Sequence, residues 1–203
     1  RGLVEGLGSG IISDTLDWLT ATPTIQGDIA LYYRHLYESI SNDAKAIADI
    51  VGVLEFSVNE AELREIAGSA LSDWVPEALR AMLPVLSVAT GQGGLRIFHE
   101  SFRRFMLEEL ARRGRRLSNV LSPVLAWLEA RDFFADAKSY RFTLAVMRRA
   151  EREAEILQRV STTFVQRSLQ FGHPHDAIGR NLELAADVAA RALNWPALVR
   201  CAE

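Results

Sequence analysis

The sequence predicts a mainly α-helical fold that carries one small antiparallel β element. Apolar residues recur every three or four positions through most of the 203 residues, the spacing of helices that bury one face. Two short apolar stretches, residues 85–89 and 95–98, instead flank a glycine-rich turn, as in a β-hairpin. With 49% hydrophobic and 24% charged residues, the chain has the composition of a packed domain rather than of a disordered segment.

Residues 1–41 are predicted to form helices separated by turns. Three glycines between positions 6 and 10 are expected to end the first helix, Pro23 to end the second, and Asp28 to cap a third. The glycines do not complete the dinucleotide-binding pattern Gly-x-Gly-x-x-Gly, because position 11 is isoleucine. The chain has no Gly-Lys-Ser or Gly-Lys-Thr either, so it contains no phosphate-cradling P-loop.

Residues 42–114 are predicted to begin with three short helices. Asp43 is expected to cap the first of them. Asn59 is expected to cap the second, with Glu62 three residues later in the capping-box pattern. Ser72 is expected to cap the third, which has a proline in its first turn, a favourable position for that residue.

The β element completes the pattern of this segment. Residues 56–58 are expected to form a short extended piece between the first two helices, residues 85–89 and 95–98 two later strands, and a long helix follows from His99. Helix, short strand, helix, helix, strand, turn, strand is the order of a winged-helix domain. The sequence therefore predicts a winged-helix domain over residues 42–114, with the two later strands as its β-wing.

The rest of the chain, residues 115–203, is predicted to be helical. The apolar periodicity predicts three helices followed by the start of a fourth, with breaks at residues 172–175 and 194–196: residues 117–130, about 139–171 and 176–193. Helices joined by short polar turns favour stacked α-helical pairs in a superhelical, TPR-like arrangement. The sequence shows no strict repeat.

His99 is the main candidate binding residue. In residues 95–106, LRIFHESFRRFM, an apolar strand ends and a helix begins with a histidine, a carboxylate and a hydroxyl in its first turn. A helix N-terminus has unpaired N–H groups and partial positive charge, so it favours an anion that His99 could also contact. The alternative is a core histidine, because Phe102 and Met106 follow on the helix face that should point inward.

Three motifs follow one another in the first half of the chain: residues 27–33, residues 59–84 and Phe98-His99-Glu100-Ser101-Phe102. In this order they resemble parts of the STAND ATPases, the signal-transduction ATPases that include the NACHT and NB-ARC proteins. The first motif resembles the helix that leads out of the family's helical lid, and the second resembles its winged-helix core. The third resembles the methionine-histidine-aspartate motif, which bacterial members often carry as histidine-x-serine-phenylalanine.

The resemblance implies a domain organisation and a role for the motif histidine. Residues 1–41 would be the end of the helical lid domain, residues 42–114 the winged-helix domain, and residues 115–203 the superhelical arm. In the family, the motif histidine contacts the β-phosphate of bound ADP and holds the protein in its closed, inactive form. By this resemblance, His99 and Ser101 are expected to bind the nucleotide phosphate.

The resemblance further implies a regulatory fragment that is not an enzyme by itself. The Walker lysine and the magnesium-binding acids have no counterpart in the chain and are expected upstream of Arg1, and Glu100 stands where the family usually has an aspartate. ADP or ATP would bind only in the full-length protein; we expect no cofactor, metal or catalytic residue in this fragment. The implied partners are the upstream nucleotide-binding domain, a protein or ligand at the arm, and further copies of the protein on activation, all in the cytoplasm.

Two other functions stay open. A winged helix often reads DNA, but its recognition helix should then be basic, and the net charge of this chain is −3. The corresponding segment contains Asp73, Trp74 and Glu77, with Arg80 as its one basic residue, which disfavours a nucleic-acid partner. The second alternative is a non-catalytic helical scaffold for protein–protein interaction, in which replacing His99 would change stability but not nucleotide handling.

Two arginine clusters are predicted to be solvated surface. Residues 112–116, RRGRR, lie at the end of a predicted helix, where a run of charges is usually solvated. Arg148, Arg149 and Arg152 alternate with glutamates, which is typical of an exposed, ion-paired helix face.

The remaining polar motifs are assigned no chemistry. Residues 173–176, His-Pro-His-Asp, are expected to form a turn and a helix cap rather than a metal site, because no further histidine or cysteine completes a ligand shell. The single cysteine, Cys201, excludes an internal disulfide and has no activating neighbour. No apolar stretch approaches the roughly 20 residues of a membrane-spanning helix. The tryptophans are expected to be packing residues: Trp18, Trp74, Trp127 and Trp195.

Overall fold

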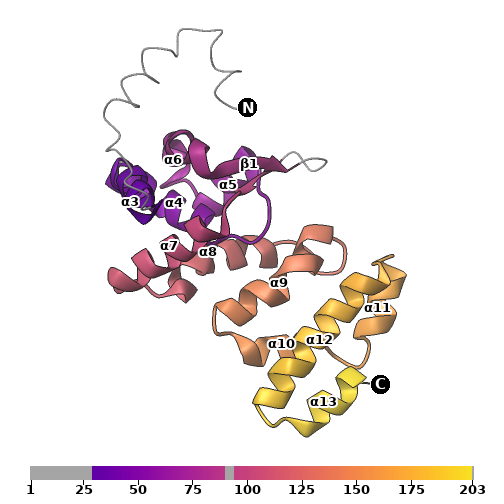
Figure 1. The fold of residues 1–203 in the computed structure, drawn as a ribbon. Helices are drawn as coiled ribbons and strands as arrows, with labels where there is room; N and C mark the ends of the chain where they lie inside the picture. The colour runs from indigo at the N-terminus through magenta and orange to yellow at the C-terminus, as the bar shows by residue number, and fades with distance from the viewer. Residues whose placement is uncertain (1–28, 90–93, 203) are drawn as a thin grey trace.

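The computed structural model describes residues 29–89 and 94–202 (Figure 1). Over this part of the chain the fold is mainly helical with one two-stranded antiparallel sheet, so the coarse fold class expected from the sequence is confirmed. The helix end expected at the glycine cluster, the break at Pro23 and the cap at Asp28 lie outside the described residues.

Three helices begin the described chain: α3 Ile29–Glu38, α4 Asn42–Val53 and α5 Glu60–Ala67. The expected cap of α4 is wrong by two residues: Ser41 accepts the N–H of Ala44 at 3.3 Å, and Asp43 lies inside the first turn. The capping box of α5 is confirmed. Asn59 accepts from the N–H of Glu62, and Glu62 from that of Asn59, each at 2.9 Å.

A short 3₁₀ turn and a helix follow, and a second 3₁₀ turn leads into the sheet: η2 Ser72–Trp74, α6 Val75–Met82 and η3 Leu83–Val85. The expected cap at Ser72 is wrong, because its hydroxyl donates to the carbonyl of Ser69 at 3.5 Å and α6 begins only at Val75. Pro76 lies in the first turn of α6, where its missing N–H costs no helical hydrogen bond.

The sheet consists of β1 (Leu86–Ala89) and β2 (Gly94–Ile97). The extended piece before α5 joins it through Val58, whose N–H and carbonyl both bond to Leu95, at 3.0 and 2.7 Å. This close approach favours glycine at position 94, since a Cβ there would lie 3.0 Å from that of Ser57. Helix α7, Glu100–Arg112, begins directly after β2.

The second half of the described chain consists of helices joined by turns: α8 Leu117–Glu129, α9 Ala137–Arg149, α10 Glu153–Arg159, α11 Phe164–Gln170, α12 His175–Arg191 and α13 Trp195–Ala202. The single helix expected over residues 139–171 is wrong. Glu151, just after the end of α9, has a left-handed φ of 62° and breaks the helix there. Residues 160–163 separate α10 from α11. The break at residues 172–175 is confirmed, with Gly172 at φ 74°.

One hydrophobic core runs through both halves. Helix α8 lies against α4 and α5, and Phe56 stacks on Phe142 of α9 with ring centroids 4.6 Å apart. Arg149, expected on an exposed helix face, is instead 19% exposed and donates to the carbonyl of Val53 at 2.7 Å. The domain boundary at residues 114 and 115 stays a prediction; Gly114, with φ 67°, ends α7 there.

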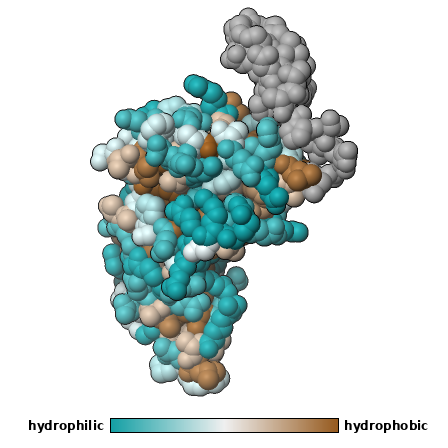
Figure 2. Space-filling view, turned by 90° about the vertical axis from the view of Figure 1, so that its left-hand side faces the viewer, coloured by the Kyte–Doolittle hydropathy of each residue, from teal (hydrophilic) through white to brown (hydrophobic). Residues whose placement is uncertain are grey.

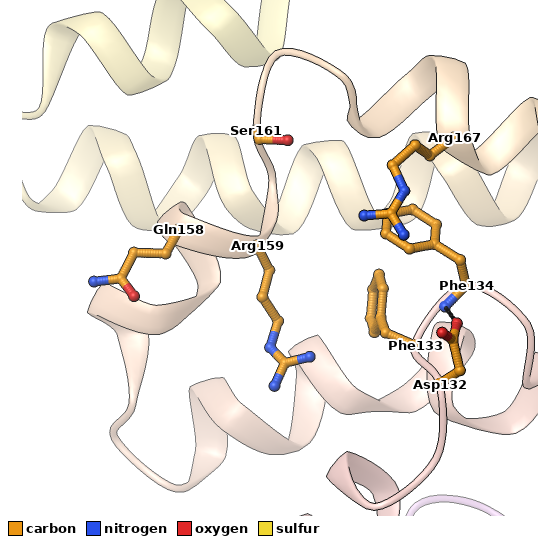
Figure 3. Close-up of a pocket in the computed structure, with 7 residues that line it drawn as sticks. All are labelled: Asp132, Phe133, Phe134, Gln158, Arg159, Ser161 and Arg167. Atoms are coloured by element: carbon orange, nitrogen blue, oxygen red, sulfur yellow. Dashed lines mark hydrogen bonds between the residues drawn. The ribbon is translucent and has the colours of Figure 1, made fainter.

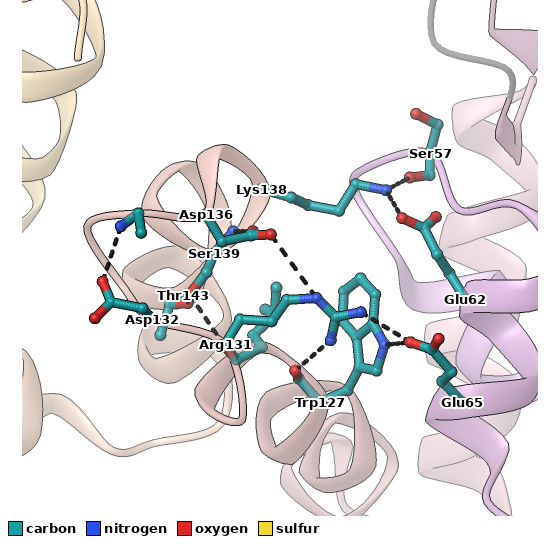
Figure 4. Close-up of polar contacts among 12 residues, drawn as sticks. Ser57, Glu62, Glu65, Trp127, Arg131, Asp132, Asp136, Lys138, Ser139 and Thr143 are labelled. Carbon is teal, nitrogen blue, oxygen red and sulfur yellow. Dashed lines mark hydrogen bonds and ion pairs between the residues drawn. The ribbon is translucent and has the colours of Figure 1, made fainter. Parts of the chain in front are cut away.

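A polar cluster fastens the two halves to each other (Figure 4). The carboxylate of Glu65 on α5 accepts from the indole N–H of Trp127 and from Arg131, both at 2.8 Å. Lys138 at the start of α9 pairs with Glu62 at 2.5 Å. These bonds join α5 to both α8 and α9, so the second half of the chain has a defined orientation against the first half.

The face of the molecule shown in Figure 2 is largely hydrophilic, with small separated hydrophobic patches. Among the described residues, no helix combines the length and the apolar character that crossing a bilayer requires.

Candidate functional site

His99 lies at the junction between β2 and α7. The N–H of Phe98 donates to the carbonyl of Val85 at 2.9 Å, which fixes the end of β2 beside the start of β1. His99 is the N-cap residue of α7, with an extended backbone (φ −106°, ψ 125°), and its side chain accepts no hydrogen bond from the first turn. The fold therefore holds the His99 backbone in place without using its ring.

The side chain of His99 is exposed, and its ring makes no hydrogen bond within residues 29–89 and 94–202. Its ring contacts the neighbouring ring of Phe98 edge to face, with centroids 4.0 Å apart. The interpretation of His99 as a core histidine is wrong. Phe102 and Met106 are fully buried, but His99 precedes the helix in extended backbone and so lies off their inward stripe. Both ring nitrogens are available to a ligand.

Ser101, the second predicted site residue, lies in the first turn of α7 and is held by the last residue of the first motif, a contact that the sequence did not predict. Its hydroxyl is 2.8 Å from that of Tyr33 on α3. Tyr33 is buried, and its ring packs edge to face on Phe102 with centroids 5.1 Å apart. A serine hydroxyl has one donor and two acceptor positions, so Ser101 can accept from Tyr33 and still donate to a ligand.

The start of α7 has the electrostatic character that an anion requires. In the described structure, the N–H groups of Glu100 and Ser101 have no backbone acceptor, as expected for the first positions of a helix. The carboxylate of Glu100 adds a negative charge, but it pairs with Arg103 at 2.6 Å. Arg103 also donates to the carbonyl of Leu54 at 3.2 Å, which ties this ion pair to the end of α4.

The opposite end of α7 carries a buried ionic cluster around Asp49 of α4. Asp49 is fully buried and accepts from the hydroxyl of Tyr37 at 2.8 Å and from Arg113 at 2.7 Å, and also from Arg115. Burial, and next the negative charge of Asp49, raise the pKa of Tyr37, so the phenol stays a hydrogen-bond donor. A carboxylate within the apolar face of α4 was the sequence signal for this cluster.

This cluster corrects the interpretation of the first arginine run as solvated surface. Two of its four arginines, Arg113 and Arg115, neutralise Asp49 and are structural. Arg112 is exposed and pairs with Glu109, and it holds the pKa of that carboxyl below its usual range through its hydrogen bonds.

The other predicted polar motifs divide between structure and surface. Arg148 pairs with Asp187 at 2.5 Å, as expected for an ion-paired face. His173 bonds to the carbonyl of Phe134 at 2.6 Å and stacks on Tyr140, so it stabilises the turn; the expected cap at Asp176 is wrong, because Pro174 is the N-cap residue.

Within the described chain, no group of three or more histidine, cysteine or acidic side chains lies close enough to hold a metal ion. Cys201 is partly buried, and burial raises the pKa of its thiol, which disfavours the nucleophilic thiolate. Trp127 is buried as expected, but Trp195 is 65% exposed and is not a packing residue of the described fold.

Comparison with known proteins adds no assignment: no family model, no curated protein and no solved structure matched the chain. The candidate site therefore consists of the exposed imidazole of His99, the hydroxyl of Ser101 positioned by Tyr33, and the first N–H groups of α7.

Proposed function

We propose that this chain is the regulatory part of a STAND-type ATPase switch. Residues 42–114 act as its winged-helix domain, and residues 115–203 act as its helical arm. In this role, His99 and Ser101 contact the phosphate of ADP that an upstream nucleotide-binding domain holds. The observation that carries the proposal is the exposed, unbonded imidazole of His99 at the N-terminus of α7.

The order of elements supports a winged-helix domain. Helices α4, α5 and α6 are followed by β1, β2 and α7, and the bridge between Val58 and Leu95 brings the early extended piece against β2. The predicted topology has two late strands and one early extended piece beside three helices, and the two-stranded sheet with its bridge to Val58 is consistent with it. Strands β1 and β2 would be the wing.

The donor set at the start of α7 fits a nucleotide phosphate. An imidazole, a hydroxyl and two free backbone N–H groups are hydrogen-bond donors to phosphate oxygens, and the helix dipole favours a negative ligand. The one opposing charge, Glu100, already pairs with Arg103. No group of three or more histidine, cysteine or acidic side chains among the described residues could hold a magnesium ion, and in this proposal hydrolysis belongs to the upstream domain.

The proposed switch works through release of this contact. While ADP is bound, His99 holds the winged helix against the nucleotide-binding domain in a closed form. Exchange for ATP loosens that contact, the arm moves with the winged helix through the Glu65 and Lys138 bonds, and the protein oligomerises in the cytoplasm. A partner bound at the arm would bias the same equilibrium.

Sequencing the coding region upstream of Arg1 tests the family assignment. We expect a Gly-x-x-x-x-Gly-Lys-Ser/Thr motif between an apolar strand and a helix, followed by a second strand that ends in acidic residues. An unrelated domain or a short leader in that place contradicts the proposal. The scaffold and DNA-binding functions would then be favoured, and salt-dependent binding of a DNA duplex would separate them.

A further inference from the structure

The helical arm has a pocket of about 300 Å³ between the α8–α9 connection and the α10–α11 segment (Figure 3). The rings of Phe133 and Phe134 form its aromatic side, edge to face with centroids 5.0 Å apart. The polar lining comes from both segments: Asp132, Gln158, Arg159, Ser161 and Arg167. The pocket thus combines an apolar surface with two cations.

Both arginines of the pocket lie over aromatic rings, one on each side of the phenylalanine pair (Figure 3). The guanidinium of Arg167 is 4.0 Å from the ring centroid of Phe134, and that of Arg159 is 5.7 Å from Phe133. A guanidinium held on a ring is oriented while its N–H edge stays free to bind an anion. The two arginines are therefore positioned in advance of a ligand.

The two cations differ in their acid partners. Arg159 donates to Glu129 at 2.8 Å, and Glu129 also pairs with Arg152. Arg167 has no carboxylate within ion-pair distance among the described residues. One positive charge at the pocket therefore lacks an acid partner.

Asp132 limits the charge of the ligand. Its Oδ1 accepts the N–H groups of Phe134 and Ala135 at 2.9 and 2.8 Å, which holds this carboxylate at the pocket rim. A doubly charged phosphate beside Asp132 would be repelled more strongly than a singly charged carboxylate. Phe171, half exposed and 6.0 Å from Phe134, extends the apolar surface past Arg167.

We propose that this pocket binds an acidic side chain of a partner peptide. The carboxylate lies between Arg159 and Arg167, and an adjacent apolar residue of the peptide packs on the exposed ring of Phe171. This assigns a partner chemistry to the arm of the proposed switch. The signalling consequence rests on that proposed function, but the binding itself needs no nucleotide.

A peptide library tests the proposal on the 203-residue chain. The library consists of heptapeptides randomised at every position, acetylated and amidated so that the termini carry no charge. We expect enrichment of aspartate or glutamate next to an aromatic or aliphatic residue. For an enriched peptide, Arg167→Gln should weaken binding about tenfold or more, as expected for loss of a charge-assisted contact. Arg180→Gln is the matched control, because Arg180 is an exposed helix arginine that pairs with Asp176.

Three results overturn the proposal: no acidic preference in the library, equal binding by the Arg167→Gln variant, or tighter binding of phosphoserine peptides than of glutamate peptides. The readout is independent of the nucleotide switch. Acidic peptides that bind a chain whose coding region lacks an upstream P-loop would support the pocket and contradict the proposed function.

Discussion

The two ends of α7 are built in opposite ways. At its N-terminal end, His99 is exposed, Ser101 lies at the surface and the first N–H groups have no backbone acceptor in the described structure. At its C-terminal end, Arg113 closes over the fully buried Asp49. The buried carboxylate of the C-terminal end is bonded by protein groups, whereas the imidazole and the first N–H groups of the N-terminal end are left available to a ligand.

One helix touches both ends. Tyr33 and Tyr37 are four residues apart on α3 and so lie on one face of it; Tyr33 bonds to Ser101, and Tyr37 bonds to Asp49. The C-terminal end of α7, with the buried Asp49, is called here the closed end, and the N-terminal end, with the exposed His99, the open end. The comparison teaches that the closed end supports the fold, whereas a ligand can bind at the open end at little cost in stability. A change near Ser101 would also reach α3 through Tyr33.

The largest effect is expected from Asp49→Ala. The substitution removes the buried carboxylate that accepts from the Tyr37 hydroxyl, Arg113 and Arg115. We expect the free energy of unfolding to fall by about 2–4 kcal/mol, somewhat less than for a fully buried pair because both arginines are partly exposed. Urea denaturation measures the loss, with Asp73→Ala, an exposed acid, as the control. A loss no larger than that of the control contradicts a structural role for the closed end.

A smaller effect should separate the two tyrosines. Tyr37→Phe leaves a buried carboxylate short of one hydrogen bond, so we expect a loss of about 1–2 kcal/mol in the free energy of unfolding. Tyr33→Phe should cost about 0.5 kcal/mol, because the exposed Ser101 can bond to water instead. Equal losses for the two variants in parallel denaturation curves would remove the distinction between the ends.

The smallest effect is expected for the stability of the fold at acidic pH, through Glu109. The hydrogen bonds from Arg112 lower the pKa of Glu109 in the folded state, so this carboxyl stabilises the fold above its unfolded pKa of about 4.3. That stability is lost as the pH falls from there through the lowered folded value. Thermal unfolding measured at a series of pH values should show a shallower acid decline for Glu109→Gln than for the unsubstituted chain. Identical slopes would show that Glu109 is not coupled to folding.

The sequence was sufficient to predict features that depend on neighbouring residues, and it was insufficient to predict features that depend on tertiary contacts. The capping box of Asn59 and Glu62 and the hairpin were predictable because each depends on residues close together in the chain. The helix break at Glu151 was not predicted, because glutamate rarely adopts a left-handed backbone and therefore, unlike glycine, does not indicate a break in the sequence. A charge run predicts solvated surface on average, and only the tertiary contact with Asp49 shows that Arg113 is structural.

The candidate site divides in the same way. The motif around His99 predicted that this residue begins a helix. Its exposure could not be predicted, because it results from the extended backbone of His99 itself, which points the side chain away from the buried face of α7. Tyr33, 68 residues from Ser101 in sequence, could not be paired with it by spacing. The pocket on the arm likewise joins segments that begin at Asp132 and Gln158 and are adjacent only in the folded chain.

The rate of ADP release from the full-length protein tests the central claim most directly. His99→Ala should release ADP at least tenfold faster than the unsubstituted protein, since one charge-assisted phosphate contact is worth about that factor. His175→Ala is the matched control, because His175 is also an exposed histidine at the start of a helix. Both variants should unfold within about 0.5 kcal/mol of the unsubstituted protein. Equal release rates for all three proteins, with their folds intact, would contradict the role of His99 as the nucleotide sensor.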